Sequence, residues 1–184
     1  MKKQPEVTEK TKRAFISAFC ELYRQKPIER ISVQEIANKS GYNRSTFYQY
    51  FCDIYELLEY LESDVLDFMH QKLHEGTGDI RDVLAIFEEK GVYLDALLGD
   101  YGSNRFLENL KTSIPFEAHR INLAADNPLT PYLLEFHMTT VLSLLRLWKR
   151  RQKDLSPEEL TDLMLCLYTG GTSAIMSKYT PHTQ

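Results

Sequence analysis

Hydrophobic side chains near the amino end of the chain recur at the spacing of an amphipathic helix. They occupy the i, i+3, i+4 and i+7 positions that form one apolar stripe: Phe15, Ala18, Phe19 and Leu22. This stripe predicts a helix over about residues 5–25, which the following Pro27 ends. The sequence shows no sustained alternation of apolar and polar residues, the pattern typical of strands. The pattern therefore predicts an all-α protein.

Two short helices joined by a tight turn are predicted between Ser32 and Phe51. Ser32 is followed three residues later by Glu35, the spacing of a capping box at the start of a helix. Gly41 ends that helix, because glycine adopts the left-handed backbone conformation that turns require. Asn43 then caps a further helix that reaches Phe51. These two helices and the turn between them are a helix-turn-helix, which places its last helix in the major groove of DNA.

More helices are predicted in the remainder of the chain. A long helix begins at Asp53, again with a glutamate three residues later, and glycine and proline residues separate the segments that follow. The predicted helices cover approximately residues 53–75, 79–90, 92–99, 103–124, 130–152 and 156–179. The long helix at Asp53 would join the helix-turn-helix to these later segments.

Charge is distributed unevenly between the two parts. Residues 1–52 contain ten Lys and Arg and five Glu, a net charge of +5, whereas residues 53–184 have a net charge of −9. A basic N-terminal part, here called the head (residues 1–52), is attracted to phosphate. An acidic remainder, here called the body (residues 53–184), is repelled by it. Chance unevenness of surface charge is the alternative explanation. We favour a helix-turn-helix DNA-binding domain, 1–52, followed by a helical regulatory and dimerisation domain, 53–184.

The last helix of the helix-turn-helix has an apolar side and a polar side. A helical wheel separates the apolar Phe47, Tyr50 and Phe51 from the polar Ser45, Thr46, Tyr48 and Gln49, with Arg44 at the amino end. The apolar side holds the angle of a recognition helix, while the polar groups reach bases and phosphates. Arg44 suits guanine, Gln49 suits adenine, and Tyr48 suits a phosphate or a thymine methyl group. The free N–H groups that follow Ser32 attract phosphate.

A set of residues within about the first 60 positions forms a pattern of its own: Ser32-Val33, Ile36-Ala37, Gly41, Thr46-Phe47-Tyr48, Phe51 and Leu57-Leu58. In this pattern the segment resembles the DNA-binding domain of the TetR family of transcriptional regulators. The resemblance implies an N-terminal three-helix DNA-binding domain and a C-terminal helical domain that binds a ligand and dimerises. It also implies base and phosphate contacts at Ser32, Gln34, Arg44, Ser45, Thr46, Tyr48, Gln49 and Tyr50.

One position departs from that family. Its members commonly have a lysine near the start of the fourth helix that binds phosphate, whereas this sequence reads Cys52-Asp53-Ile54. Loss of that positive charge weakens phosphate binding, because each contact with a phosphate releases a bound counterion. Lys39 and the N-terminal lysines are the candidates to compensate.

The last two predicted helices have the features of a dimer interface. Their apolar and small side chains form the expected contact face: Leu145, Trp148, Leu167, Gly170, Gly171 and Ala174. Small residues let a second helix approach closely, so two copies of this helix pair would form a four-helix bundle. Core packing within one chain is the alternative explanation of the same pattern.

A ligand pocket in the C-terminal part is a further prediction. Its candidate lining residues are Tyr93, Phe106, Phe116, Phe136 and His137. For each of these residues, a place in the hydrophobic core is the alternative. We expect no cofactor, metal or catalytic site, because the sequence contains no glycine-rich phosphate loop, nucleophile elbow or paired-carboxylate motif. His70 and His74 have a spacing that can hold zinc, but no accompanying ligand pattern.

The three cysteines and the hydropathy of the chain bear on its compartment. Cys20, Cys52 and Cys166 lie far apart, which fits reduced thiols in a cytoplasmic protein better than disulfides. No apolar run approaches the ~18 residues that a membrane span needs, so we expect no membrane partner.

These patterns predict a homodimeric DNA-binding transcriptional regulator. The expected partners are a palindromic double-stranded DNA operator, a second copy of the chain, and an effector that releases the repressor from DNA. One alternative keeps DNA binding but replaces the small-molecule effector with a partner protein. A remoter alternative is a helical enzyme or scaffold that does not bind DNA.

Overall fold

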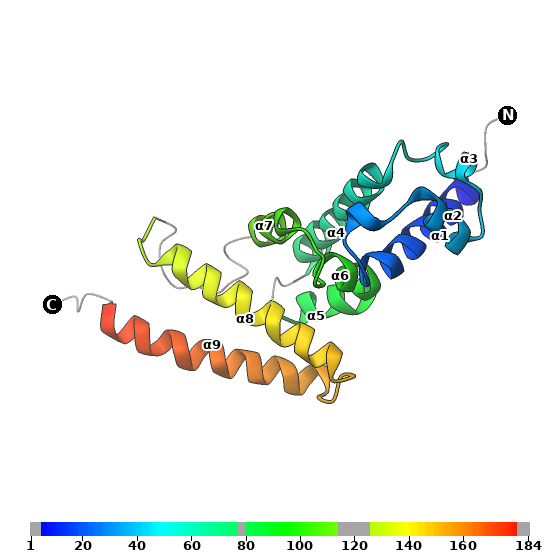
Figure 1. Ribbon diagram of the computed structural model, residues 1–184. Helices are drawn as coiled ribbons and strands as arrows, with labels where there is room; N and C mark the ends of the chain where they lie inside the picture. Colours follow the sequence, from blue (N-terminus) through cyan, green and yellow to red (C-terminus); the bar gives the residue numbers. More distant parts are fainter. Residues whose placement is uncertain (1–4, 77–79, 114–125, 180–184) are drawn as a thin grey trace. The chain divides into compact units, whose positions relative to one another are not determined.

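The computed structural model describes residues 5–76, 80–113 and 126–179, and every regular element in these ranges is a helix (Figure 1). The prediction of an all-α fold is confirmed. The chain divides into two compact units, one of residues 1–75 and 86–114 and the other of residues 76–85 and 115–184. None of the helices in the described ranges combines the length and the apolar character needed to cross a membrane.

The first unit contains the N-terminal helices and part of the body. Its elements are α1 (Pro5–Tyr23), a 3₁₀ turn (Ile28–Arg30), α2 (Val33–Ser40), α3 (Arg44–Phe47), α4 (Ile54–Glu75), α6 (Gly91–Leu97) and α7 (Asn104–Ser113). α5 (Ile80–Glu89) passes from the second unit into the first, and the second unit holds α8 (Thr130–Arg150) and α9 (Pro157–Tyr179). These bounds lie within a few residues of the predicted ones except at α3 and at residues 114–124, which are outside the described residues.

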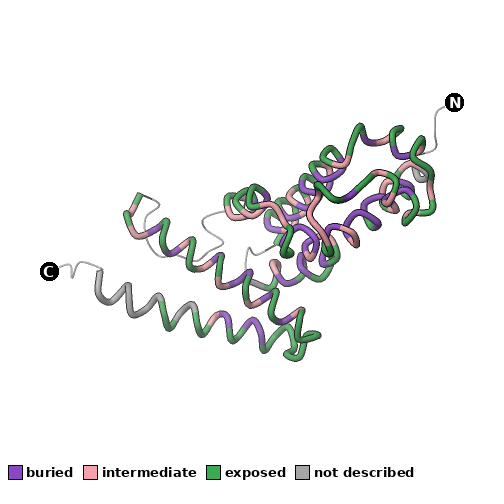
Figure 2. Tube along the Cα trace, viewed as in Figure 1, coloured by how far each residue is buried: buried purple, intermediate pink, exposed green. Residues whose placement is uncertain are grey.

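Aromatic side chains form the core around the helix-turn-helix. Phe15, Phe19 and Phe47 are fully buried, and buried positions follow the inner faces of α1 and α4 (Figure 2). The rings of Phe15 and Phe47 meet edge to face with centroids 5.3 Å apart. Burial of each such side chain contributes about 1.5–3 kcal/mol, so this contact anchors α3 on α1.

α3 is shorter than the helix predicted to reach Phe51. Its regular part ends at Phe47, and the N–H groups of Gln49 and Tyr50 donate to carbonyls three residues earlier, at 3.2 and 2.9 Å. Hydrogen bonds of this spacing tighten the backbone into turns, as often happens at a helix end. The side chain of Phe51 is nevertheless buried, so the predicted apolar side is retained through these turns.

The helix-turn-helix and the first helices of the body share one core. α1 packs against both α2 and α6, and α4 packs against α6 and α7. The first compact unit therefore continues past residue 52, where the functional boundary is predicted. The N-terminal helices are held to the body by the packing of α1 against α6 as well as by their covalent connection to α4.

A buried carboxylate links α4 to α7. The side chain of Glu62 is only 6% exposed, and its Oε2 accepts a hydrogen bond of 2.9 Å from Nη2 of Arg105, a side chain that is mostly exposed. The other oxygen, Oε1, is buried and has no hydrogen-bond partner among the described residues. A buried charge destabilises a protein unless an opposite charge or hydrogen bonds compensate for the loss of water. The ion pair with Arg105 therefore supplies much of the stabilisation of the buried Glu62 carboxylate.

A hydrogen-bonded turn connects α8 with α9 in the second unit. The indole Nε1 of Trp148 donates to the carbonyl of Leu155 at 2.8 Å, and the N–H of Lys153 donates to the carbonyl of Trp148 at 2.9 Å. Gln152 and Lys153 both have φ 57°, in the left-handed region of backbone conformation that residues other than glycine rarely adopt. These hydrogen bonds offset the backbone strain and fix Trp148 inside the unit.

Substitution of Arg105 by alanine is expected to destabilise the first unit. The change leaves the Glu62 carboxylate buried without its partner, which should lower the free energy of unfolding by about 1–3 kcal/mol. Urea unfolding followed by circular dichroism measures this loss. The double variant Glu62→Leu, Arg105→Ala should recover most of it, because the buried charge is removed as well. A double variant as unstable as Arg105→Ala alone would contradict this account.

Candidate nucleic-acid interface

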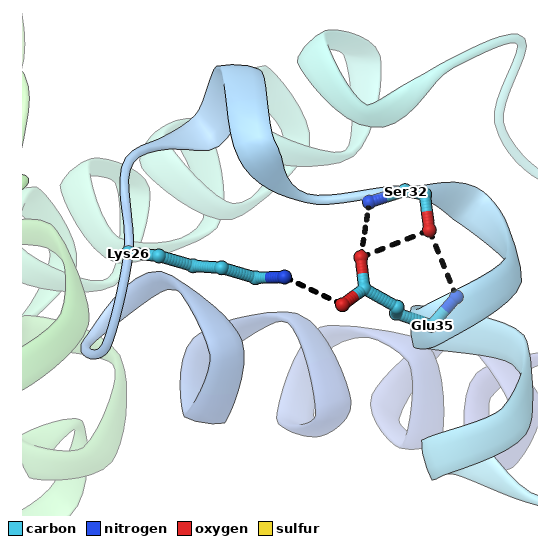
Figure 3. Close-up of polar contacts among 3 residues, drawn as sticks. All are labelled: Lys26, Ser32 and Glu35. Atoms are coloured by element: carbon cyan, nitrogen blue, oxygen red, sulfur yellow. Dashed lines mark hydrogen bonds and ion pairs between the residues drawn. The ribbon is translucent and has the colours of Figure 1, made fainter.

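Ser32 fixes the start of α2 through a complete capping box. Its hydroxyl accepts a hydrogen bond from the N–H of Glu35 at 3.2 Å, and the Glu35 carboxylate accepts from the N–H of Ser32 at 2.9 Å (Figure 3). Lys26, in the segment that follows α1, binds the other carboxylate oxygen of Glu35. The hydrogen bond from Lys26, followed by those from Ser32, lowers the pKa of Glu35 to about 2.

The turn between α2 and α3 depends on a glycine. Gly41 has φ 77°, a left-handed conformation in which any other residue would be strained. The N–H of the next residue, Tyr42, donates to the carbonyl of Ala37 at 3.1 Å, which closes the end of α2. The ring of Tyr42 packs against Phe15, with centroids 5.4 Å apart. The predicted role of Gly41 as a turn residue is confirmed.

Asn43 caps α3 and also binds two side chains predicted to touch DNA. Its Oδ1 accepts from the N–H of Thr46 at 2.9 Å, from the Thr46 hydroxyl at 2.9 Å and from the Ser45 hydroxyl at 2.6 Å. Since both hydroxyls donate to Asn43, their oxygens remain as acceptors. They are thereby suited to amino groups on base edges rather than to phosphate oxygens, which only accept.

The polar side chains of α3 and of the two residues that follow it face solvent. Arg44, Ser45, Tyr48 and Gln49 are exposed, Thr46 is partly exposed and Phe47 is fully buried. Tyr50 is partly buried, and its ring lies 6.4 Å from that of Phe15, so it packs on the core side as the helical wheel predicts. Nη2 of Arg44 donates to the hydroxyl of Tyr48 at 3.1 Å. This pair was missed in the sequence, although its i, i+4 spacing is the signal that could have revealed it.

Two further candidate contacts on α2 are already engaged within the protein. Nε2 of Gln34 donates to Oδ1 of Asn38 at 2.7 Å. Lys39 forms an ion pair with Glu21 of α1 at 2.6 Å. This ion pair partly neutralises the Lys39 charge that was expected to replace the missing lysine.

The start of α4 is acidic at the place where the family resemblance implies a lysine. Oδ1 of Asp53 accepts from the N–H of Glu56 at 2.8 Å, and the Glu56 carboxylate accepts from the N–H of Cys52. A second hydrogen bond, from the Cys52 thiol to the Glu56 carboxylate, raises the pKa of that thiol. Two carboxylates thus occupy the helix end that would otherwise offer N–H groups to a phosphate.

Comparison with known families agrees with this geometry. Residues 15–61 match the model of the bacterial regulatory proteins of the tetR family, and this range covers the second half of α1, all of α2 and α3, and the first part of α4. These residues form a TetR-family domain. The match identifies α2, its glycine turn and α3 as the helix-turn-helix of a DNA-binding transcription regulator, as predicted.

Solved structures extend the similarity to the fold of most of the chain. A TetR transcriptional regulator from Streptococcus agalactiae 2603V is 23% identical, with a TM-score of 0.64 over 87% of this chain and 94% of that one. A TetR family transcription regulator from Marinobacter aquaeolei VT8 is 16% identical, with a TM-score of 0.62 over 90% and 97%. The dihydroxyacetone kinase operon activator DhaS is 17% identical, with a TM-score of 0.52 over 89% and 97%. No curated protein matches the chain in sequence.

The candidate pocket residues lie in different parts of the TetR-like fold. Phe106 is fully buried in the first unit, where Tyr93 is partly buried and burial raises its pKa. Phe136 and His137 belong to the second unit, and Phe136 is 53% exposed. Phe116 is outside the described residues. A ligand pocket formed by these residues stays a prediction.

The candidate dimer residues separate into buried and exposed groups. Leu145 and Trp148 are buried inside the chain, where they pack within it. Leu167 is 49% exposed, and Gly170 and Gly171 are exposed. The side chain of the remaining candidate, Ala174, is outside the described set.

The Glu35 cap should make stability depend on acid pH. Because the folded pKa of about 2 lies below the unfolded value of 4.5, the cap stabilises the domain fully above pH 4.5 and loses this effect as the pH falls towards 2. Glu35→Gln should therefore be less stable than the natural sequence at pH 7, with a difference that shrinks below pH 4.5. Urea unfolding at pH 7, 5, 4 and 3 measures it.

Glu29→Gln is the matched control, since it removes an exposed carboxylate from the same domain. A difference between Glu35→Gln and the natural sequence that stays constant from pH 7 to pH 3 would contradict the role of the charged cap.

Proposed function

We propose that this protein is a homodimeric transcriptional regulator that acts in the cytoplasm and binds a palindromic operator, by default as a repressor. The observation that carries the proposal is the exposure of Arg44 at the start of α3 and of Tyr48 and Gln49 directly after it, while Phe47 anchors α3 in the core. A recognition helix needs this division between a fixed apolar side and an accessible polar side. The net charge of +5 over residues 1–52 supports contact with the DNA backbone.

The proposed base and phosphate contacts remain those predicted from the sequence, refined by the structure. Arg44 contacts guanine, Gln49 contacts adenine, and Ser45 and Thr46 accept hydrogen bonds from base amino groups. Tyr50, which is partly buried, contacts a phosphate through its hydroxyl. Ser32 and Gln34, at the start of α2, approach the phosphates.

We propose that dimerisation uses the exposed face of α9. Leu163, Leu167, Gly170 and Gly171 are exposed and follow the i, i+4, i+7, i+8 spacing of one helix face. A Cβ built on either glycine meets no atom within 4 Å, so this face is open to a second helix. Leu147 and Tyr132 of α8 are further exposed apolar residues of the same unit. Closely approaching helices of this kind support a four-helix bundle between two copies.

We propose that an effector controls DNA binding through α4 and α6. α4 runs from the helix-turn-helix into the body, and α6 packs against both α1 and α4. A shift of α6 would therefore displace both α1 and α4. Because α3 packs on α1, this displacement would change the orientation of α3. Preferential binding of the effector to one of the two orientations would shift the equilibrium between them.

A partner protein is the second candidate for the effector. The exposed aromatic side chains of Tyr132 and Phe136 on α8, 76% and 53% exposed, favour it, because exposed apolar patches mark protein interaction sites. Activation is the second candidate for the direction of control, since DhaS, which shares the fold, is an operon activator.

DNA recognition is tested by selection of bound sequences from a random DNA pool, followed by salt titration on the selected site. We expect a near-palindromic sequence and a logarithm of affinity that falls linearly with the logarithm of salt concentration. Asp53→Lys should bind more tightly at low salt and steepen the slope by about 1, because it restores a cation at the start of α4. Glu75→Lys, at the far end of α4, is the control for added positive charge.

Failure to enrich any sequence, together with no binding at low salt, would favour a protein that does not read DNA. An equal gain in DNA affinity for Asp53→Lys and Glu75→Lys would show that the net charge of the protein raises the affinity, and that the start of α4 makes no specific contact with phosphate.

Dimerisation is tested with Gly171→Gln. Replacing a helical glycine favours the helix by about 1 kcal/mol, so loss of the dimer cannot be attributed to unfolding. We expect the natural protein to have twice the 21.5 kDa mass of one chain and the variant to shift towards one chain. Analytical ultracentrifugation measures both masses. Asp162→Asn, about 100° away from Leu163 around α9, is the control and should stay dimeric. A monomeric natural protein or an unchanged variant would contradict this interface.

A further inference from the structure

Arg44, at the start of α3, and Tyr48, which caps its end, form a preformed pair of side chains. Nη2 of Arg44 donates to the hydroxyl oxygen of Tyr48 at 3.1 Å, and the guanidinium carbon lies 5.7 Å from the centre of the Tyr48 ring. Both side chains are exposed, and the i, i+4 spacing places them one above the other on the helix. Tyr48 thus contacts Arg44 in two ways. Its hydroxyl accepts a hydrogen bond from the guanidinium group, and the face of its ring lies against the same positive charge.

The Tyr48 ring is itself held by the core. It meets the ring of Phe47 edge to face, at 90° and with centroids 5.7 Å apart. Phe47 is fully buried and packs edge to face on Phe15 of α1. A chain of aromatic contacts therefore runs from the core to Tyr48, and Arg44 rests on its outer end. This support reduces the number of rotamers that the long arginine side chain samples before it meets DNA.

The direction of this hydrogen bond determines which donor groups of Arg44 and Tyr48 remain available to bind DNA. Tyr48 accepts from Arg44, so the hydrogen of its own hydroxyl remains for a second acceptor. Arg44 uses one N–H group for Tyr48 and retains others in the planar fork that binds O6 and N7 of guanine. DNA supplies acceptors of both kinds, phosphate oxygens along the backbone and acceptor atoms on the guanine edge.

We propose that Tyr48 is the positioning residue for Arg44 and that the pair reads one guanine next to a bound phosphate. The Tyr48 hydroxyl donates to the phosphate oxygen and accepts from Arg44, which in turn holds the guanine. The phosphate contact and the base contact are thereby coupled, so that loss of Tyr48 weakens discrimination at that base as well as affinity. This inference rests on the proposed DNA-binding function and deepens it by naming the base and the two coupled side chains.

A double-mutant cycle on the selected operator tests the coupling. The variants are Arg44→Ala, Tyr48→Phe and their combination, each measured on the natural site and on a site in which 7-deazaguanine replaces the guanine. Arg44→Ala should lower affinity about 10- to 100-fold on the guanine site. Tyr48→Phe should lower it about 3- to 10-fold and reduce the preference for guanine over 7-deazaguanine.

The double variant distinguishes coupled from independent contacts. If Tyr48 acts through Arg44, adding Tyr48→Phe to Arg44→Ala should cost clearly less than Tyr48→Phe costs alone. If the two losses multiply, Tyr48 is an independent phosphate contact and the inference is wrong. The salt slope should stay unchanged for Tyr48→Phe, because the neutral hydroxyl releases no counterion.

The outcomes also separate this inference from the proposed function. A natural protein that enriches no DNA sequence would overturn both. A natural protein that binds its operator, while Arg44→Ala retains full preference for guanine, would overturn only the Arg44–Tyr48 pair. Both side chains are exposed, so each variant should fold with an unchanged circular dichroism spectrum and unfolding midpoint, and losses of affinity can be assigned to the interface.

Discussion

The edge-to-face contact between Phe15 and Phe47 is the interaction on which the rest of the DNA-binding segment depends. Phe47 belongs to α3 and Phe15 to α1, and both side chains are fully buried. The buried ring holds α3 at a fixed position, so the polar side chains on its other side point outwards together. Tyr42 and Tyr50 pack on the same Phe15 ring, which ties the turn before α3 and the turn after it to one point of the core.

Local hydrogen bonds at the helix ends set where each helix begins. Ser32 with Glu35 and Ser156 with Glu159 form the same reciprocal arrangement of backbone N–H groups and side-chain oxygens. At the start of α4 the arrangement is similar, but the Glu56 carboxylate accepts from the N–H of Cys52 rather than from that of Asp53. At α4 this device has a further effect, because its two carboxylates stand where a phosphate would approach. Carboxylates that cap the start of a helix and stabilise it can therefore weaken the electrostatic attraction of that helix end for a DNA phosphate.

Packing joins the part that reads DNA to the part that we propose responds to an effector. α1 contacts α6, α4 contacts α6 and α7, and the Glu62–Arg105 ion pair connects α4 with α7. A helix-turn-helix attached only by α4 would move freely around that single connection. In this chain, any change in its orientation must also adjust the α1–α6 contact, so the energetic cost of the two orientations depends on residues of the body.

The sequence by itself determined the helical class, the helix starts and the two sides of α3, because each depends on side chains three or four residues apart. The capping residues Ser32 and Asn43 were predictable for the same reason, and Gly41 was predictable because glycine alone adopts the left-handed conformation without strain. Tertiary structure alone decided that Leu145 and Trp148 face the interior while Leu167 stays exposed, since one helix can turn either side towards its own chain. It also decided that Lys39 meets Glu21 and that Glu62 meets Arg105, because residues far apart in sequence become neighbours only when the helices pack.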